Sequence, residues 1–95
     1  MVIYGAQLLT RFAKKHAGSR KPLARFVQLT EAAAWPHFEA LKQTFPSADR
    51  GKLTRSVIFD IAGNNYRLIA LVDFELQSLF VQGIYTHAEY DSKEL

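Results

Sequence analysis

The second half of the chain contains three runs rich in β-branched and aromatic residues, separated by short turn signals. These runs are RSVIFDI, YRLIALVDF and LFVQGIYT, at residues 55–61, 66–74 and 79–86. Gly-Asn-Asn at 63–65 and the segment from 75 to 78 are typical of tight turns. Because connections this short join antiparallel neighbours, the pattern predicts three consecutive strands in an antiparallel meander.

The first half has the spacing of helices instead. Residues 5–18 carry apolar side chains at helical intervals, which predicts a first helix. Ser19 is expected to cap a second helix, in which apolar residues recur every three or four positions as far as Ala34. Pro36 suits the first turn of a short third helix. Residues 44–52, TFPSADRGK, are expected to form the loop that leads into the strands.

This order predicts an α+β fold, with N-terminal helices packed on a small antiparallel β-sheet. The β-prone start MVIY, residues 1–4, is expected to join the sheet as a short strand. A chain of 95 residues with 48% hydrophobic residues suits one core, so we predict a single domain over residues 1–95.

Several classes of protein are disfavoured by what the sequence lacks. There is no apolar run of about 18 residues and no signal-peptide pattern, so we expect a cytoplasmic protein without a membrane partner. With no cysteine, a disulfide framework, a thiolate nucleophile and a cysteine zinc site are excluded. The three histidines are scattered, so we expect neither a metal site nor a cofactor.

Positive charge is concentrated at the N-terminus. Residues 1–30 hold six Lys and Arg and no acid, whereas the other residues hold six against nine acids. Such a block favours a polyanion or an acidic protein partner, although a solvated helix surface would have the same composition. The candidate phosphate-binding residues of this block are Lys14, Lys15, Arg20 and Lys21.

Alternation along the strands predicts which side chains share a face. On the middle strand Tyr66, Leu68, Ala70, Val72 and Phe74 should face the helices, and Arg67, Ile69, Leu71 and Asp73 the other side. On the last strand the same rule groups Leu79, Val81, Gly83, Tyr85 and His87 against Phe80, Gln82, Ile84 and Thr86.

Three side chains near the strand ends are candidates for chemistry. Arg67 has a fork of donors that suits a phosphate, but it would equally suit pairing with Asp60. His87 can exchange a proton near neutral pH, although a histidine at a strand end is often a surface or capping residue. Tyr90 can stack on a base or donate a hydrogen bond, or it can cover a core edge.

Four further residues carry weaker signals. Lys52 and Arg55 flank the entry to the first long strand and are second-rank candidates for phosphate contacts. His37 is expected to be structural, and His16 is expected to be a charge partner at a helix C-terminus.

Three linked segments resemble the HigB-type toxins of the RelE/ParE superfamily. They are WPHFEALKQTFPSAD, VIFDIAGNNYRLIALVDF and VQGIYTHAEYD, and the resemblance covers roughly residues 3 to 91. It departs at Tyr85, where relatives have a small residue before THAEYD. Because the chain stops four residues past this motif, any C-terminal helix that a relative adds is expected to be absent.

The resemblance implies a function. Toxins of this kind are ribosome-dependent mRNA interferases, in which the ribose 2′-hydroxyl attacks the adjacent phosphate and leaves a cyclic phosphate without a metal. It implies Arg67 as the phosphate clamp, His87 as general acid or base, and Tyr90 as a stacking or proton-handling partner. The implied partners are mRNA on the ribosome, with contacts to rRNA, and a HigA-like helix-turn-helix antitoxin.

Two other classes of function stay open. A ParE-like toxin would keep the fold and inhibit DNA gyrase without a nuclease site. A non-catalytic RNA- or protein-binding module would use the basic helices alone, and the C-terminal motif would only cap the sheet.

Overall fold

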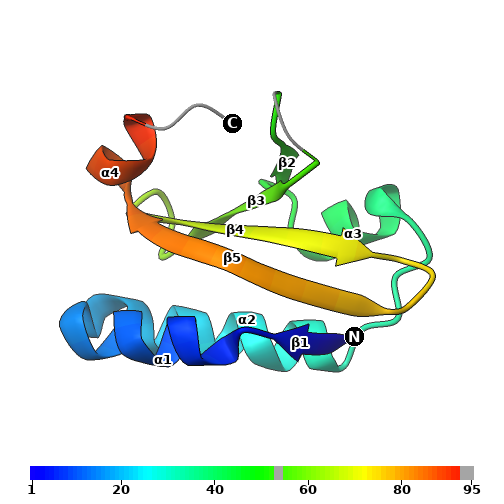
Figure 1. Cartoon of the computed structure of the whole chain (residues 1–95), viewed down its shortest axis with the longest axis horizontal. Helices are drawn as coiled ribbons and strands as arrows, with labels where there is room; N and C mark the ends of the chain where they lie inside the picture. The colour runs from blue at the N-terminus through cyan, green and yellow to red at the C-terminus, as the bar shows by residue number, and fades with distance from the viewer. Residues whose placement is uncertain (53–54, 93–95) are drawn as a thin grey trace.

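A computed structural model describes residues 1–52 and 55–92. A five-stranded sheet carries α1 and α2 along one face, while α4 lies at one end of the sheet on the side away from these helices (Figure 1). In chain order the elements are β1 (Val2–Tyr4), α1 (Ala6–Lys15), a 3-10 turn η1 (Ala17–Ser19), α2 (Arg20–Glu31), α3 (Phe38–Thr44), β2 (Asp49–Arg50), β3 (Val57–Ile61), β4 (Tyr66–Asp73), β5 (Ser78–Thr86) and α4 (His87–Asp91). The α+β prediction is confirmed.

The sheet has the order β1-β5-β4-β3-β2. The meander of β3, β4 and β5 is antiparallel as predicted, and the N-terminal strand joins the sheet. The sheet is mixed rather than antiparallel, however, because β1 runs parallel to β5. The long connection through the helices and the meander makes this parallel pairing possible. The expected loop at 44–52 also contains the two-residue strand β2, which pairs with β3.

The helices differ from the prediction at four ends. The first helix, α1, ends at Lys15 rather than near Gly18. Ser19 stands at the start of α2, but its hydroxyl donates to the His16 carbonyl at 2.6 Å instead of capping the helix. The second helix ends at Glu31 rather than near Ala34. Pro36 precedes the third helix, because His37 is its N-cap and accepts a hydrogen bond at Nδ1 from the third-residue amide.

The core lies between the helices and one face of the sheet. Phe26 of α2 meets Phe59 of β3 edge to face, and both contact Phe45 after α3. On β4 the predicted inward face is confirmed, because Leu68 and Ala70 are fully buried in this cluster. None of the helices in the described part of the chain is long and apolar enough to cross a membrane.

The predicted faces of β5 are wrong beyond Val81, and a β-bulge is the reason. Ile69 pairs with Gly83 but Ala70 pairs with Val81, so β5 holds one extra residue, Gln82, at this point. An extra residue reverses the alternation for the rest of the strand. Ile84 therefore packs against the core, and Tyr85, paired with Arg67, is turned to the outer face.

Candidate functional site

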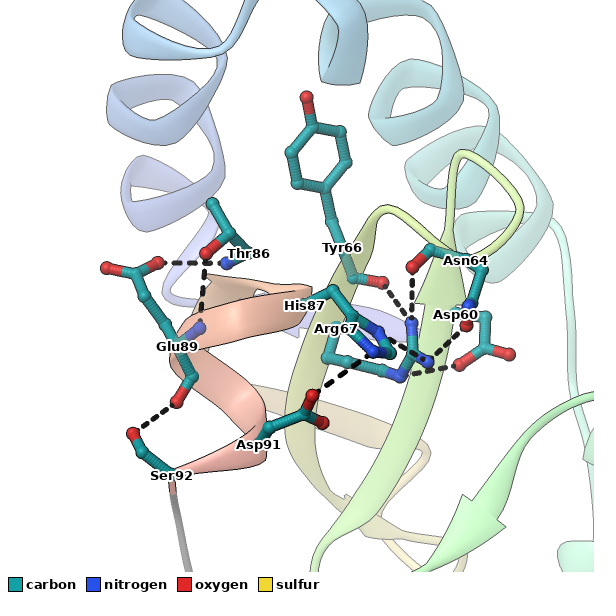
Figure 2. A network of polar contacts seen from close by, with 9 residues as sticks. All are labelled: Asp60, Asn64, Tyr66, Arg67, Thr86, His87, Glu89, Asp91 and Ser92. Atoms are coloured by element: carbon teal, nitrogen blue, oxygen red, sulfur yellow. Dashed lines mark hydrogen bonds and ion pairs between the residues drawn. The ribbon is translucent and has the colours of Figure 1, made fainter.

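The β3–β4 hairpin holds the Arg67 side chain in a cradle of oxygen atoms (Figure 2). Arg67 Nε is 3.1 Å from Asp60 Oδ1 across the strand pair. Nη1 donates to the carbonyls of Asn64 and Tyr66, each at 3.2 Å, and Nη2 donates to the Asn64 side-chain oxygen. Only 11% of the side chain is exposed. The Asp60 pairing considered from the sequence is therefore present, and it fixes the guanidinium plane.

The same guanidinium reaches His87, the first residue of α4. Arg67 Nη2 lies 3.3 Å from His87 Nδ1, and His87 Nε2 lies 3.2 Å from Asp91 Oδ2 one turn along the helix. A guanidinium only donates hydrogen bonds, so Nδ1 must present its lone pair and Nε2 must carry the proton. Both ring nitrogens thus have partners, and this contact pattern defines one tautomer of the neutral ring.

Local signals build α4 directly after β5. The Thr86 hydroxyl accepts from the Glu89 amide, and the Glu89 carboxylate accepts from the Thr86 amide, which forms a capping box. The His87 amide donates to the Asn65 carbonyl at 3.0 Å and ties the helix to the hairpin turn. The motif THAEYD therefore forms a helix after the last strand, whereas the sequence predicted helices only N-terminal to the sheet.

Tyr90, three residues after His87 on α4, completes the cluster. The Arg67 guanidinium carbon lies 5.6 Å from the centre of the Tyr90 ring, within the range of a cation–π contact. Tyr90 is half-buried and His87 is exposed. The three residues singled out from the sequence, Arg67, His87 and Tyr90, are thus brought together at one end of the sheet.

The basic candidates do not converge on this cluster. Lys14, Lys15, Arg20 and Lys21 belong to the helix layer that covers the other face of the sheet (Figure 1). Lys52 is exposed, and Arg55 lines a shallow surface depression together with Leu71 and Phe80.

His37 has contacts that agree with its expected structural role, while the role of His16 as a charge partner at a helix C-terminus stays a prediction. His37 caps α3, as described above. His16 stacks on Phe12, with 4.2 Å between the ring centres, just past the C-terminal end of α1.

Two residues of the cluster escaped the sequence reasoning. Asn64 contributes two of the four oxygens around Arg67, and Asp91 contacts the outer nitrogen of His87. A signal for Asp91 was available, because Thr86 and Glu89 have capping-box spacing and would have placed Asp91 one turn after His87. In the described part of the chain, no three His, Asp or Glu side chains are grouped so as to hold a metal ion.

Comparison with known proteins identifies the family. Residues 19–93 match the HigB toxin family, described as the RelE-like toxic component of a toxin-antitoxin system. The chain belongs to the HigB toxin family. Over 90 residues it is 37% identical to the mRNA interferase toxin HigB of Escherichia coli strain K12. This match covers 88% of this chain and 86% of that protein. A HigB mRNA interferase of E. coli O6:H1 is 30% identical over 80 residues, covering 83% of this chain and 78% of the relative.

The match to the HigB family includes the whole cluster. The hairpin and α4 both lie within residues 19–93. Membership implies an antitoxin partner, because the family is the toxic half of a two-component system.

Proposed function

We propose that this HigB-family protein is a ribosome-dependent mRNA interferase that cleaves without a metal. Its relatives carry the name mRNA interferase. The observation that carries the proposal is the contact chain Asp91–His87–Arg67, in which a carboxylate, an imidazole and a guanidinium follow each other at 3.2 Å and 3.3 Å. Moving a phosphoryl group from a 5′-oxygen to a 2′-oxygen requires a base for the 2′-hydroxyl proton and a cation for the phosphate charge, and the imidazole and the guanidinium can supply them.

The first step is the capture of the scissile phosphate by Arg67. In the free protein, Nη2 donates to the neutral His87 ring, whereas a phosphate oxygen is an anionic acceptor. Charge-assisted hydrogen bonds are roughly twice as strong as neutral ones. The phosphate therefore displaces His87 from Nη2, while Asp60 and Asn64 keep the rest of the guanidinium in place.

Loss of the Arg67 contact frees the lone pair on His87 Nδ1. This nitrogen then takes the proton of the 2′-hydroxyl as the 2′-oxygen attacks phosphorus. Asp91 stabilises the imidazolium that forms, since it accepts from Nε2 throughout. The bond from phosphorus to the 5′-oxygen breaks, and we assign the proton on that leaving oxygen to the Tyr90 hydroxyl. The products are a 2′,3′-cyclic phosphate and a free 5′-hydroxyl.

The substrate of this reaction is mRNA in a translating ribosome, where the protein also contacts rRNA. The protein partner is a HigA-like helix-turn-helix antitoxin in the same cytoplasm. The high positive charge of residues 1–30 supports contact with rRNA, because it is unopposed by any acid in that segment.

Primer extension on a defined mRNA tests the proposal, with purified protein and with or without programmed ribosomes. The wild type should give discrete cuts only with ribosomes. His87→Asn is the sharpest variant, because its side-chain oxygen can still accept from Arg67 but cannot take a proton. It should remain folded and cut at least about 100-fold more slowly, within the usual range for a lost general base.

Two outcomes would contradict the proposal. Full activity of His87→Asn would remove His87 from the chemistry. The absence of any cut by a folded wild-type protein would favour a ParE-like gyrase inhibitor or a non-catalytic binding module, which gyrase and RNA-binding assays would then separate.

A further inference from the structure

A cleft runs between α1 and the part of β5 that β1 leaves uncovered. β1 pairs with β5 only as far as Phe80, so within residues 1–52 and 55–92 no strand lies beside the following residues of β5 on this side. The cleft has a volume of about 320 Å³. It is lined from α1 by Leu8, Arg11, Phe12 and Lys15, and from β5 by residues 82–85.

One end of the cleft lies at the residue that pairs with Arg67 in the sheet. Tyr85 lies at its β5 wall, pairs with Arg67 in the strand register, and stands two residues before His87. The C-terminal end of α1, which carries Lys15, lies at the same end of the sheet as α4 (Figure 1). The Tyr85 end of the cleft is therefore one strand away from Arg67.

The side chains of the cleft suit one class of ligand. Arg11 and Lys15 are exposed and one helical turn apart, so their charges form a row along α1. Among the described residues no Asp or Glu lines the cleft, and none occurs in residues 1–30. Tyr85 adds an aromatic ring, and a row of cations beside an aromatic ring is how proteins hold single-stranded nucleic acid.

The position of the Tyr85 ring depends on the β-bulge and on Gly83. Without Gln82 as the extra residue, Tyr85 would face the core. A Cβ at residue 83 would lie 2.5 Å from the Tyr85 hydroxyl oxygen and 2.8 Å from the adjacent ring carbon. Glycine at this position therefore lets the ring lie back across the strand on the outer face of the sheet, beside the cleft that Tyr85 helps to line.

We propose that this cleft binds the stretch of the mRNA strand next to the scissile phosphate, with Arg11 and Lys15 on successive phosphates and Tyr85 stacked on a base. This deepens the proposed function and rests on it. An extended segment of a protein partner, added along the uncovered part of β5, is the alternative occupant that the experiment must exclude.

The first measurement is the binding of a short fluorescein-labelled single-stranded RNA at several salt concentrations. Each phosphate contact on a single strand contributes about 0.7 to the slope of log K against log salt. Arg11→Ala and Lys15→Ala should each lower that slope by about 0.7, and the double variant by about 1.4. Arg25→Ala removes one charge from the exposed part of α2, away from the cleft, and should leave the slope unchanged.

The second measurement concerns the stacked base. Tyr85→Leu should weaken RNA binding at least about 5-fold, and Tyr85→Phe should restore most of it, because stacking needs the ring and not the hydroxyl. In the ribosomal cleavage assay, the double variant Arg11→Ala/Lys15→Ala should raise KM and leave kcat nearly unchanged.

The outcomes separate the two proposals. RNA binding that depends on Arg11 and Lys15, in a protein that does not cleave, would support the cleft and remove the interferase function. An unchanged slope in the double variant would overturn the cleft as an RNA site. Unchanged RNA binding with a weakened antitoxin complex would do the same and would assign the cleft to the protein partner.

Discussion

Replacing Arg67 with alanine should destabilise the protein strongly, in addition to its effect on cleavage. The side chain is 11% exposed and makes an ion pair with Asp60 and three hydrogen bonds to oxygens of Asn64 and Tyr66. Asp60 is 28% exposed and Asn64 is exposed, so water replaces part of what is lost. We count about 1.5 kcal/mol for the partly buried ion pair and about 0.5 kcal/mol for each hydrogen bond, which gives about 3 kcal/mol in total.

Thermal unfolding followed by circular dichroism measures this loss. For a domain of this size, 1 kcal/mol shifts Tm by roughly 4–8 °C, so Arg67→Ala should lower Tm by about 12–24 °C. Asn64→Ala is the matched control, because it removes one side-chain acceptor and leaves the ion pair, and with about 0.5 kcal/mol lost it should lower Tm by only about 2–4 °C.

A small shift would refute the reasoning. If Arg67→Ala melted within about 4 °C of the wild type, the oxygens around the guanidinium would contribute little to folding. Cleavage must then be compared well below the Tm of each variant, where both are folded. Loss of cleavage under those conditions reports the role of Arg67 at the phosphate, separately from its role in the hairpin.

Three further predictions concern local structure. Gly5 and Gly63 both have positive φ, but only at Gly5 would a Cβ lie 3.0 Å from a β5 carbonyl oxygen. Gly63→Ala should therefore cost about 1 kcal/mol and Gly5→Ala clearly more, and equal losses in urea unfolding would contradict this. Thr86→Ala removes the capping box and should cost α4 about 1 kcal/mol, seen as faster hydrogen exchange in α4 with little change in Tm. Trp35 Nε1 donates to Thr44 Oγ1 at 3.0 Å. Trp35→Phe and Thr44→Val should show a coupling of about 1 kcal/mol in a double-mutant cycle, and strict additivity would argue against the bond.

The strands of the meander could be predicted from the sequence because three signals agree. Alternation, β-branched residues and short turns all point to the same element at residues 57–61, 66–73 and 78–86. The direction of β1 was not predictable in this way. Its three residues have no turn that fixes their neighbour, so tertiary packing decides that β1 runs parallel to β5.

The bulge shows where alternation fails as a guide. The sequence around Gln82 reads as a regular strand, and nothing in its composition reveals one extra residue. The core requires Val81 and Ile84 to face the same side, although an odd number of positions separates them, and a bulge satisfies this. A prediction from alternation alone therefore placed Tyr85 on the wrong face of the sheet.

The cluster itself was partly predictable, since Arg67 and His87 carry charge or a titratable ring at strand ends. Their contact was not, because it depends on a turn that brings Asn65 to the first amide of α4. The Asp60 alternative also could not be excluded by pattern. It proved compatible with a role at the phosphate, because an arginine has several donors and only Nη2 needs to change partner.

Because α4 is attached to the rest of the protein by few contacts, it can lose its position without a measurable loss in the stability of the whole fold. The helix has five residues and buries none of them, so it contributes little to the free energy of unfolding. It is nevertheless the element that carries His87, Tyr90 and Asp91. Its main described links to the hairpin are the His87 amide to the Asn65 carbonyl and Arg67 to the ring of His87. A variant can therefore lose the position of His87 while its Tm is unchanged, so local hydrogen exchange in α4, rather than global melting, reports whether the proposed catalytic cluster is assembled.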